Sequence, residues 1–65
     1  MNKQRRRKTD ELIRELRAIQ AEVGMIRDAE KAEASSILSA LEVEALTEAG
    51  AAIGEAINLL AEAVA

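Results

Sequence analysis

Residues 12–26 read LIRELRAIQAEVGMI and carry the clearest pattern in this 65-residue chain. The aliphatic residues of this stretch follow one another at steps of four, three, four and three: Leu12, Leu16, Ile19, Val23 and Ile26. That spacing lines one seam of an α-helix, because a helical turn takes about 3.6 residues. The positions between them are mostly charged or polar. The stretch therefore predicts an amphipathic first helix with a narrow apolar stripe.

The second half of the chain has a wider apolar face. Four columns of a seven-residue repeat are apolar or small there, and they include Leu46, Ala49, Ala52, Ile53, Ala56, Ile57 and Leu60. Glu48, Glu55 and Glu62 fall in one further column, which is expected to face water. A helix that is apolar over so many columns contacts more than one neighbour. The second helix is therefore expected to be central, with the first helix packed outside it.

A break in the pattern separates the two halves. The seam of the first helix fails at Glu30 and Glu33, and Ser35 is suited to cap a following helix. Gly24 and the step between residues 28 and 29 are alternative breaks. The chain has no Pro and no aromatic residue, so helix propensity is favourable almost throughout. The predicted organisation of the single domain 1–65 is a helix at about 3–34, a turn near 35–36 and a helix at about 37–64.

The small size of this all-α, antiparallel two-helix hairpin predicts that it assembles with copies of itself. A domain of this length buries only about 60% of the surface that its unfolded chain exposes. Disulfides and His or Cys metal sites cannot compensate, because the chain has no Cys and no His. We therefore predict a homo-oligomeric helical bundle, and a dimeric four-helix bundle is favoured. The predicted oligomer interface comprises Leu12, Leu16, Ile19, Val23, Ile26, Leu46, Ala49, Ala52, Ile53, Ala56, Ile57 and Leu60.

The residue inventory argues against catalysis, metal binding and membrane insertion. With no His, Cys or Tyr, general acid–base chemistry would depend on carboxylates, Lys or hydroxyl groups. We therefore expect no enzyme activity, no catalytic residue, no metal site and no cofactor. The most apolar region, 49–65, is shorter than the roughly 20 apolar residues that span a bilayer, and it contains two Glu. No signal-peptide pattern follows the basic start, so the expected location is the cytoplasm.

Gly50 and Gly54 form a Gly-x-x-x-Gly match. In lipid this motif brings two helices into close contact. Here it lies in an Ala-rich helix interrupted by Glu55, Asn58 and Glu62. Close packing in a soluble bundle is therefore favoured over dimerisation in a membrane.

A basic run stands at the start of the chain: Lys3, Arg5, Arg6, Arg7 and Lys8. All nine basic residues lie within the first 31 positions, and the remainder carries six Glu. One interpretation pairs the run with Glu55, Glu62 and the negative end of the second helix. The other makes it a phosphate-binding site for nucleic acid or a nucleotide. The net charge of −3 and the absence of aromatic residues favour the structural interpretation.

Three stretches carry a resemblance to a known group: MNKQRRRK at 1–8, DAEKAE at 28–33 and EAINLL at 55–60. Together with the first helix they resemble small uncharacterised helical proteins of bacteriophage and prophage genomes. This chain differs in having Leu38 where the group tends to carry Pro, and it lacks the group's aromatic residue near Ala34. The resemblance implies a phage accessory role in the host cytoplasm, including interference with host defence.

A second likeness is architectural: Rop-type RNA-binding regulators are helical hairpins of nearly this size that dimerise. No functional residue can be carried over from them, because a shared fold does not imply a shared function. The leading hypothesis is a non-enzymatic oligomer that binds a host or phage macromolecule, such as a protein partner. The alternative is a phosphate-ligand binder that holds RNA or a signalling nucleotide with the basic run.

Overall fold

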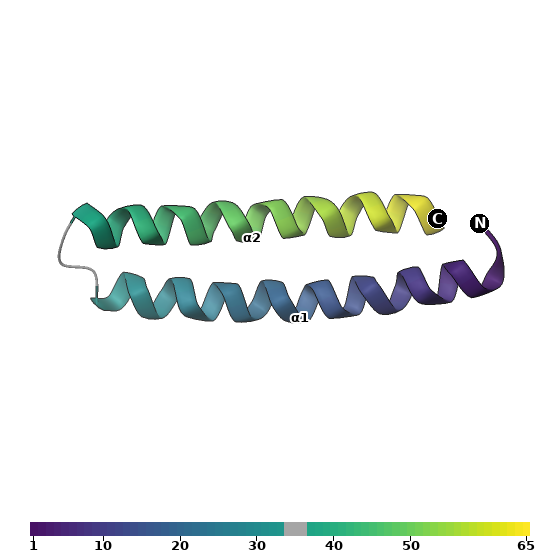
Figure 1. Cartoon of the computed structure of the whole chain (residues 1–65), viewed down its shortest axis with the longest axis horizontal. Coiled ribbons are helices and arrows are strands. Elements are labelled where there is room, and N and C mark those ends of the chain that lie inside the picture. The colour runs from purple at the N-terminus through teal and green to yellow at the C-terminus, as the bar shows by residue number, and fades with distance from the viewer. Residues whose placement is uncertain (34–36) are drawn as a thin grey trace.

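The chain folds as a hairpin of two long helices. The computed structural model describes residues 1–33 and 37–65, with the backbone alone at Leu38. Helix α1 spans Lys3–Glu33 and helix α2 spans Ile37–Val64. The helices lie side by side and antiparallel, with both termini at one end (Figure 1). The predicted all-α hairpin is confirmed.

The alternative breaks in the first helix are excluded. Gly24 and the step from Asp28 to Ala29 both lie inside α1, which is continuous from Lys3 to Glu33. The turn predicted near 35–36 falls outside the described residues.

Local hydrogen bonds fix the start of α1. The Asn2 side-chain oxygen Oδ1 accepts a hydrogen bond from the Arg5 N–H at 2.9 Å, which is the geometry of a helix N-cap. The Asn2 carbonyl accepts the first helical bond, from the Arg6 N–H at 2.9 Å. Thr9 is buried, and its Oγ1 donates to the Arg5 carbonyl at 2.8 Å and lies 3.6 Å from the Met1 sulfur. This capping lets α1 begin inside the basic run although positive charge is unfavourable at a helix N-terminus.

Each helix turns one stripe toward its neighbour, and the stripe positions follow steps of four and three. On α1 the buried and half-buried stripe is Thr9, Ile13, Leu16, Gln20, Val23, Arg27 and Glu30. On α2 it is Ser39, Val43, Leu46, Gly50, Ile53, Ile57, Leu60 and Val64. This alternation is the heptad spacing that keeps two helices in contact along a shared seam.

The seam on α1 differs from the one that the sequence predicts. Leu16 and Val23 lie in it, but Leu12, Ile19 and Ile26 remain exposed on its flank. Polar side chains take much of the inner stripe instead. Two series of α1 residues have this spacing of four and three: the predicted one, which includes Leu12 and Ile19, and a more polar one, which includes Ile13 and Gln20. Both series contain Leu16 and Val23. The hairpin contact is made by the more polar series.

The hairpin is elongated and has little interior. Its dimensions are 50 × 15 × 12 Å and its radius of gyration is 15.1 Å, against about 11 Å for a compact domain of this length. In the described part of the chain, Ile13 and Ile57 are the only buried apolar residues, at 7% and 6% exposed. Both lie toward the end that carries the termini. Most apolar side chains are therefore available for further contacts.

Candidate interaction surfaces

The helix pair has two different flanks. Residues that follow a seam position on either helix lie on one flank, since antiparallel helices place equivalent heptad positions side by side. There an open groove of about 640 Å³ runs between the helices. It is lined by Arg17, Gln20, Ala21, Val23, Gly24, Met25, Arg27, Asp28, Leu46, Thr47, Gly50 and Ala51. We call this flank the polar groove, after its charged residues Arg17, Arg27 and Asp28, although Ala, Gly and aliphatic residues make up most of its lining.

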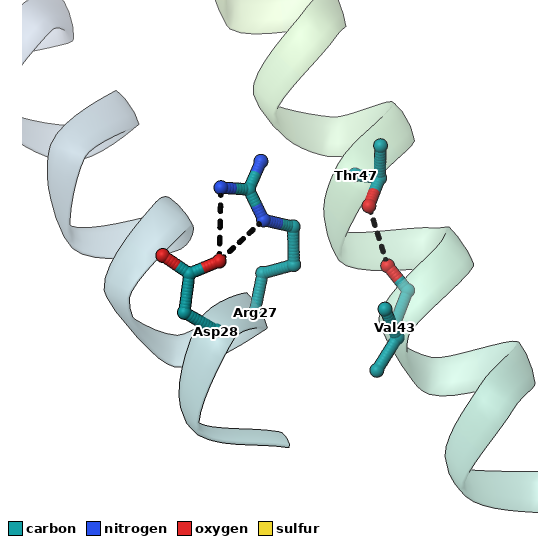
Figure 2. A network of polar contacts seen from close by, with 4 residues as sticks. All are labelled: Arg27, Asp28, Val43 and Thr47. Carbon is teal, nitrogen blue, oxygen red and sulfur yellow. Dashed lines mark hydrogen bonds and ion pairs between the residues drawn. The ribbon is translucent and has the colours of Figure 1, made fainter. Parts of the chain in front are cut away.

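Two charged residues of the polar groove, Arg27 and Asp28, are paired with each other. Figure 2 shows the Arg27 guanidinium lying between the helices, with Nε and one terminal nitrogen on Asp28 Oδ1 at 3.1 and 3.0 Å. Thr47 Oγ1 donates to the Val43 carbonyl at 2.8 Å within α2. The Arg27 and Asp28 side chains are 38% and 68% exposed, so this ion pair adds little to stability.

The Gly-x-x-x-Gly match on α2 receives a side chain from α1. Gln20 Nε2 donates a hydrogen bond to the Gly50 carbonyl at 3.0 Å. A Cβ built on Gly54 would stand only 2.8 Å from the same Gln20 Nε2. Gly54 is therefore the residue that leaves room for the Gln20 amide. The contact is made by a side chain, and a Cβ on Gly50 would meet nothing within 4 Å, so within the hairpin the motif does not bring the two helix backbones into close contact.

The two glycines of this motif should respond differently to Ala. A Cβ on Gly50 meets nothing within 4 Å, so Gly50→Ala should raise the free energy of unfolding by about 0.8–1.0 kcal/mol through helix propensity. Gly54→Ala should gain much less, because its methyl displaces the Gln20 amide from a hydrogen bond worth about 0.5–1.5 kcal/mol. Thermal denaturation followed by circular dichroism at one protein concentration measures both. Equal gains at the two positions would show that the Gln20 contact contributes nothing.

The opposite flank carries the residues that precede a seam position, and it is mostly apolar and exposed, although Lys8, Glu15, Glu22 and Glu42 also lie on it. It carries Leu12, Ile19 and Ile26 from α1 and Ala49, Ala56 and Ala63 from α2, with Ala52 and Leu59 at its edge. We call this flank the apolar face. Leu12, Ile19 and Ile26 are 38%, 45% and 53% exposed. Isolated exposed aliphatic residues are ordinary, but a row of exposed aliphatic and Ala side chains along a helix pair marks an interaction surface.

The total exposed surface is larger than a monomer of this mass should have. The hairpin exposes 5050 Å², whereas a folded monomer of 7.0 kDa is expected to expose about 4,000 Å². The excess, of the order of 1,000 Å², is close to the roughly 800 Å² that each partner buries in a standard protein interface.

The structure divides the residues of the predicted oligomer interface into two groups. Leu12, Ile19, Ile26, Ala49 and Ala52 are exposed and Ala56 is half-buried, all on the apolar face. The remaining residues belong to the seam within the hairpin: Leu16, Val23, Leu46, Ile53, Ile57 and Leu60. Ile57 is only 6% exposed in that seam, so its side chain is not accessible to a second copy.

Sequence reasoning missed the polar members of the seam, above all Thr9 and Gln20, and it missed Ile13. Ile13 follows Leu12 directly, and the predicted seam runs through Leu12 because Leu12, Leu16 and Ile19 are all aliphatic at steps of four and three. Thr9, Ile13, Leu16 and Gln20 have the same kind of spacing, so a search that allowed polar residues would have found Ile13.

The basic run is an exposed cluster at the end of the hairpin that carries the termini. Lys3, Arg5, Arg6, Arg7 and Lys8 are all exposed. Lys8 forms an exposed ion pair with Glu11 at 3.6 Å. Within the described residues, no ion pair joins the run to Glu55 or Glu62.

The pairing expected between the basic run and the acidic column of α2 is therefore not observed. Glu48, Glu55 and Glu62 are exposed, as predicted, and their column lies opposite the seam of α2. These three carboxylates therefore point away from α1.

The described residues hold no metal-binding or membrane-spanning element. Residues 1–33 and 37–65 contain no group of three or more Asp, Glu, His or Cys placed to hold a metal ion. In the same ranges, neither helix is long and apolar enough to cross a bilayer. The surfaces that the fold does present are the apolar face, the polar groove and the basic run.

The comparisons with known proteins give no relative: no family model matches the chain, and neither the curated proteins nor the solved structures contain a match.

Proposed function

We propose that this chain is a non-enzymatic helical interaction protein that works as a homo-oligomer, with a dimeric four-helix bundle as its basic unit. The observation that carries the proposal is the apolar face, which stays exposed in the isolated hairpin. The lack of His, Cys and Tyr leaves no strong nucleophile or neutral-pH base, so the assembly acts by binding. The resemblance to small phage proteins supports a phage accessory role in binding a host or phage macromolecule.

Self-association is tested by light scattering after size exclusion, together with circular dichroism over a dilution series. A protein that is stabilised by its own partner melts at a temperature that rises with concentration. We expect a mass of at least twice 7.0 kDa and a melting temperature that falls on dilution. A helical monomer that melts cooperatively at a temperature independent of protein concentration would refute the proposal.

The second candidate function is phosphate-ligand binding by the basic run, and one observation favours it. Arg5, Arg6 and Arg7 are exposed and have no ion-pair partner among the described residues. Arg guanidinium groups that are free of carboxylates can bind phosphate oxygens in a bidentate manner. Such binding weakens steeply with salt, whereas a protein partner held by apolar contacts tolerates salt.

Replacing Arg5, Arg6 and Arg7 together with Gln separates the two functions. Gln keeps helix propensity, and surface substitutions of this kind change stability by only about 0.5 kcal/mol. The variant should therefore fold and associate as the wild type does. If the run binds phosphate, affinity for RNA or a nucleotide, measured by titration at two salt concentrations, should collapse in the variant. Wild-type protein that binds neither ligand at low salt would exclude the second candidate.

A further inference from the structure

The apolar face is uneven, because its two helices contribute side chains of different size. On α1, Leu12, Ile19 and Ile26 project as a ridge of large side chains. On α2, Ala49, Ala56 and Ala63 form a row of methyl groups, so the surface beside the ridge is a shallow trough. A two-fold symmetric interface must bring this one surface against itself.

Two symmetry axes are compatible with stacking two such faces. An axis perpendicular to the helices sets ridge on ridge and trough on trough, which crowds one half of the interface and leaves a void in the other. An axis parallel to the helices sets each ridge in the partner's trough. Well-packed protein interiors alternate large and small side chains and leave few voids. The shape of the face therefore favours the parallel axis.

The charges at the ends of the helices favour the same arrangement. The basic run gives the start of α1 a charge of +5, the rest of α1 has a net charge of −3, and α2 carries five Glu and no basic residue. With the parallel axis each basic run lies at the level of the C-terminal end of the partner's α2, which carries Glu55 and Glu62. With the perpendicular axis the two acidic α2 helices lie together.

We infer that the apolar face is covered by a second copy of this chain, related by a two-fold axis parallel to the helices, so that Ile19 of each copy lies on the Ala row of the other, between Ala49 and Ala56. This inference rests on the proposed function and adds the geometry of the assembly. It has a consequence for the basic run: both hairpins point the same way, so the two runs meet at one end of the bundle. Their repulsion is limited, since exposed charges are screened beyond about 8 Å at physiological ionic strength.

Single-cysteine variants test this geometry cleanly, because the natural chain has no Cys. Ile19 is the centre of the ridge, so Ile19→Cys reports contact between two α1 helices, and Ala56→Cys reports contact between two α2 helices. Ala18→Cys, on an exposed position away from the face, measures random collision. Each variant is oxidised alone and in equimolar mixture with the others after exchange of subunits, and the products are separated on non-reducing gels.

The parallel axis predicts a disulfide-linked dimer from the mixture of Ile19→Cys and Ala56→Cys, at least tenfold more abundant than from either variant alone or from any mixture with Ala18→Cys. Efficient cross-linking of Ile19→Cys with itself would overturn the inference in favour of the perpendicular axis. A dimer by light scattering with no cross-link above the Ala18→Cys background would also overturn it, because the parallel axis brings Ile19 of one copy beside the Ala row of the other. Monomeric protein would overturn it together with the proposed function.

Discussion

Ile57→Ala is expected to lower the free energy of unfolding by about 2–5 kcal/mol, the range for replacing a buried Ile by Ala. Ile57 is 6% exposed and shares the buried part of the seam with Ile13. A domain of this size has a small total stability, so a loss of this size should leave much of the protein unfolded at 37 °C. Urea denaturation followed by circular dichroism, at the same concentration as the wild type, measures the change.

Met25→Ala is the matched control for Ile57→Ala. Met25 lies at the outer edge of the polar groove and is 71% exposed. Ala and Met have similar helix propensities, so this change should stay within about 0.5 kcal/mol of the wild type. A loss at Met25 as large as the loss at Ile57 would mean that this edge of the polar groove is buried in the native protein.

The extent of the two helices follows directly from the sequence. Helix formers fill both segments, and neither Gly24 nor the pair Asp28 and Ala29 interrupts α1. Helix propensity and capping are local properties, so a pattern along the chain is sufficient to predict them. The antiparallel arrangement follows as well, because a short connection between two long helices leaves few other ways to pack them.

The assignment of faces could not be predicted in the same way. Hydrophobic spacing shows which positions avoid water, but it does not show which neighbour covers them. The track through Leu12, Ile19 and Ile26 is the more apolar one, yet the hairpin contact uses Ile13 and Gln20. Gln20 takes part because Gly54 leaves space for its amide, and the Gly50 carbonyl accepts its hydrogen bond. That fit depends on the alignment of two helices and is invisible in either sequence segment alone.

The basic run illustrates the other limit of the sequence. The sequence places all nine basic residues in the first helix and none in the second, whereas acidic residues occur in both. The charge count did not predict which way the acidic side chains of α2 point. Glu55 and Glu62 lie on the side of α2 opposite the seam, so they do not face α1. Net complementarity of two helices therefore does not require ion pairs between them.

Ile19→Glu is expected to disrupt the oligomer. Ile19 is 45% exposed in the hairpin, so the hairpin itself can place a carboxylate there in water. In the proposed assembly the same position is the centre of the interface, and an unpaired buried charge costs about 3–5 kcal/mol. The dissociation constant should therefore rise by at least about two orders of magnitude, since 1.4 kcal/mol corresponds to a factor of ten.

Ala18→Glu supplies the control, because it adds the same charge one residue away on an exposed position of α1 outside the apolar face. Sedimentation equilibrium over a wide concentration range should give a monomer for Ile19→Glu and the wild-type mass for Ala18→Glu. Helix content of Ile19→Glu should fall with the loss of the oligomer, since the isolated hairpin buries only Ile13 and Ile57 among its described apolar residues. If Ile19→Glu instead kept the wild-type mass and melting temperature, the apolar face would lie outside the interface, and the assembly would have to form through the polar groove or the outer sides of the helices.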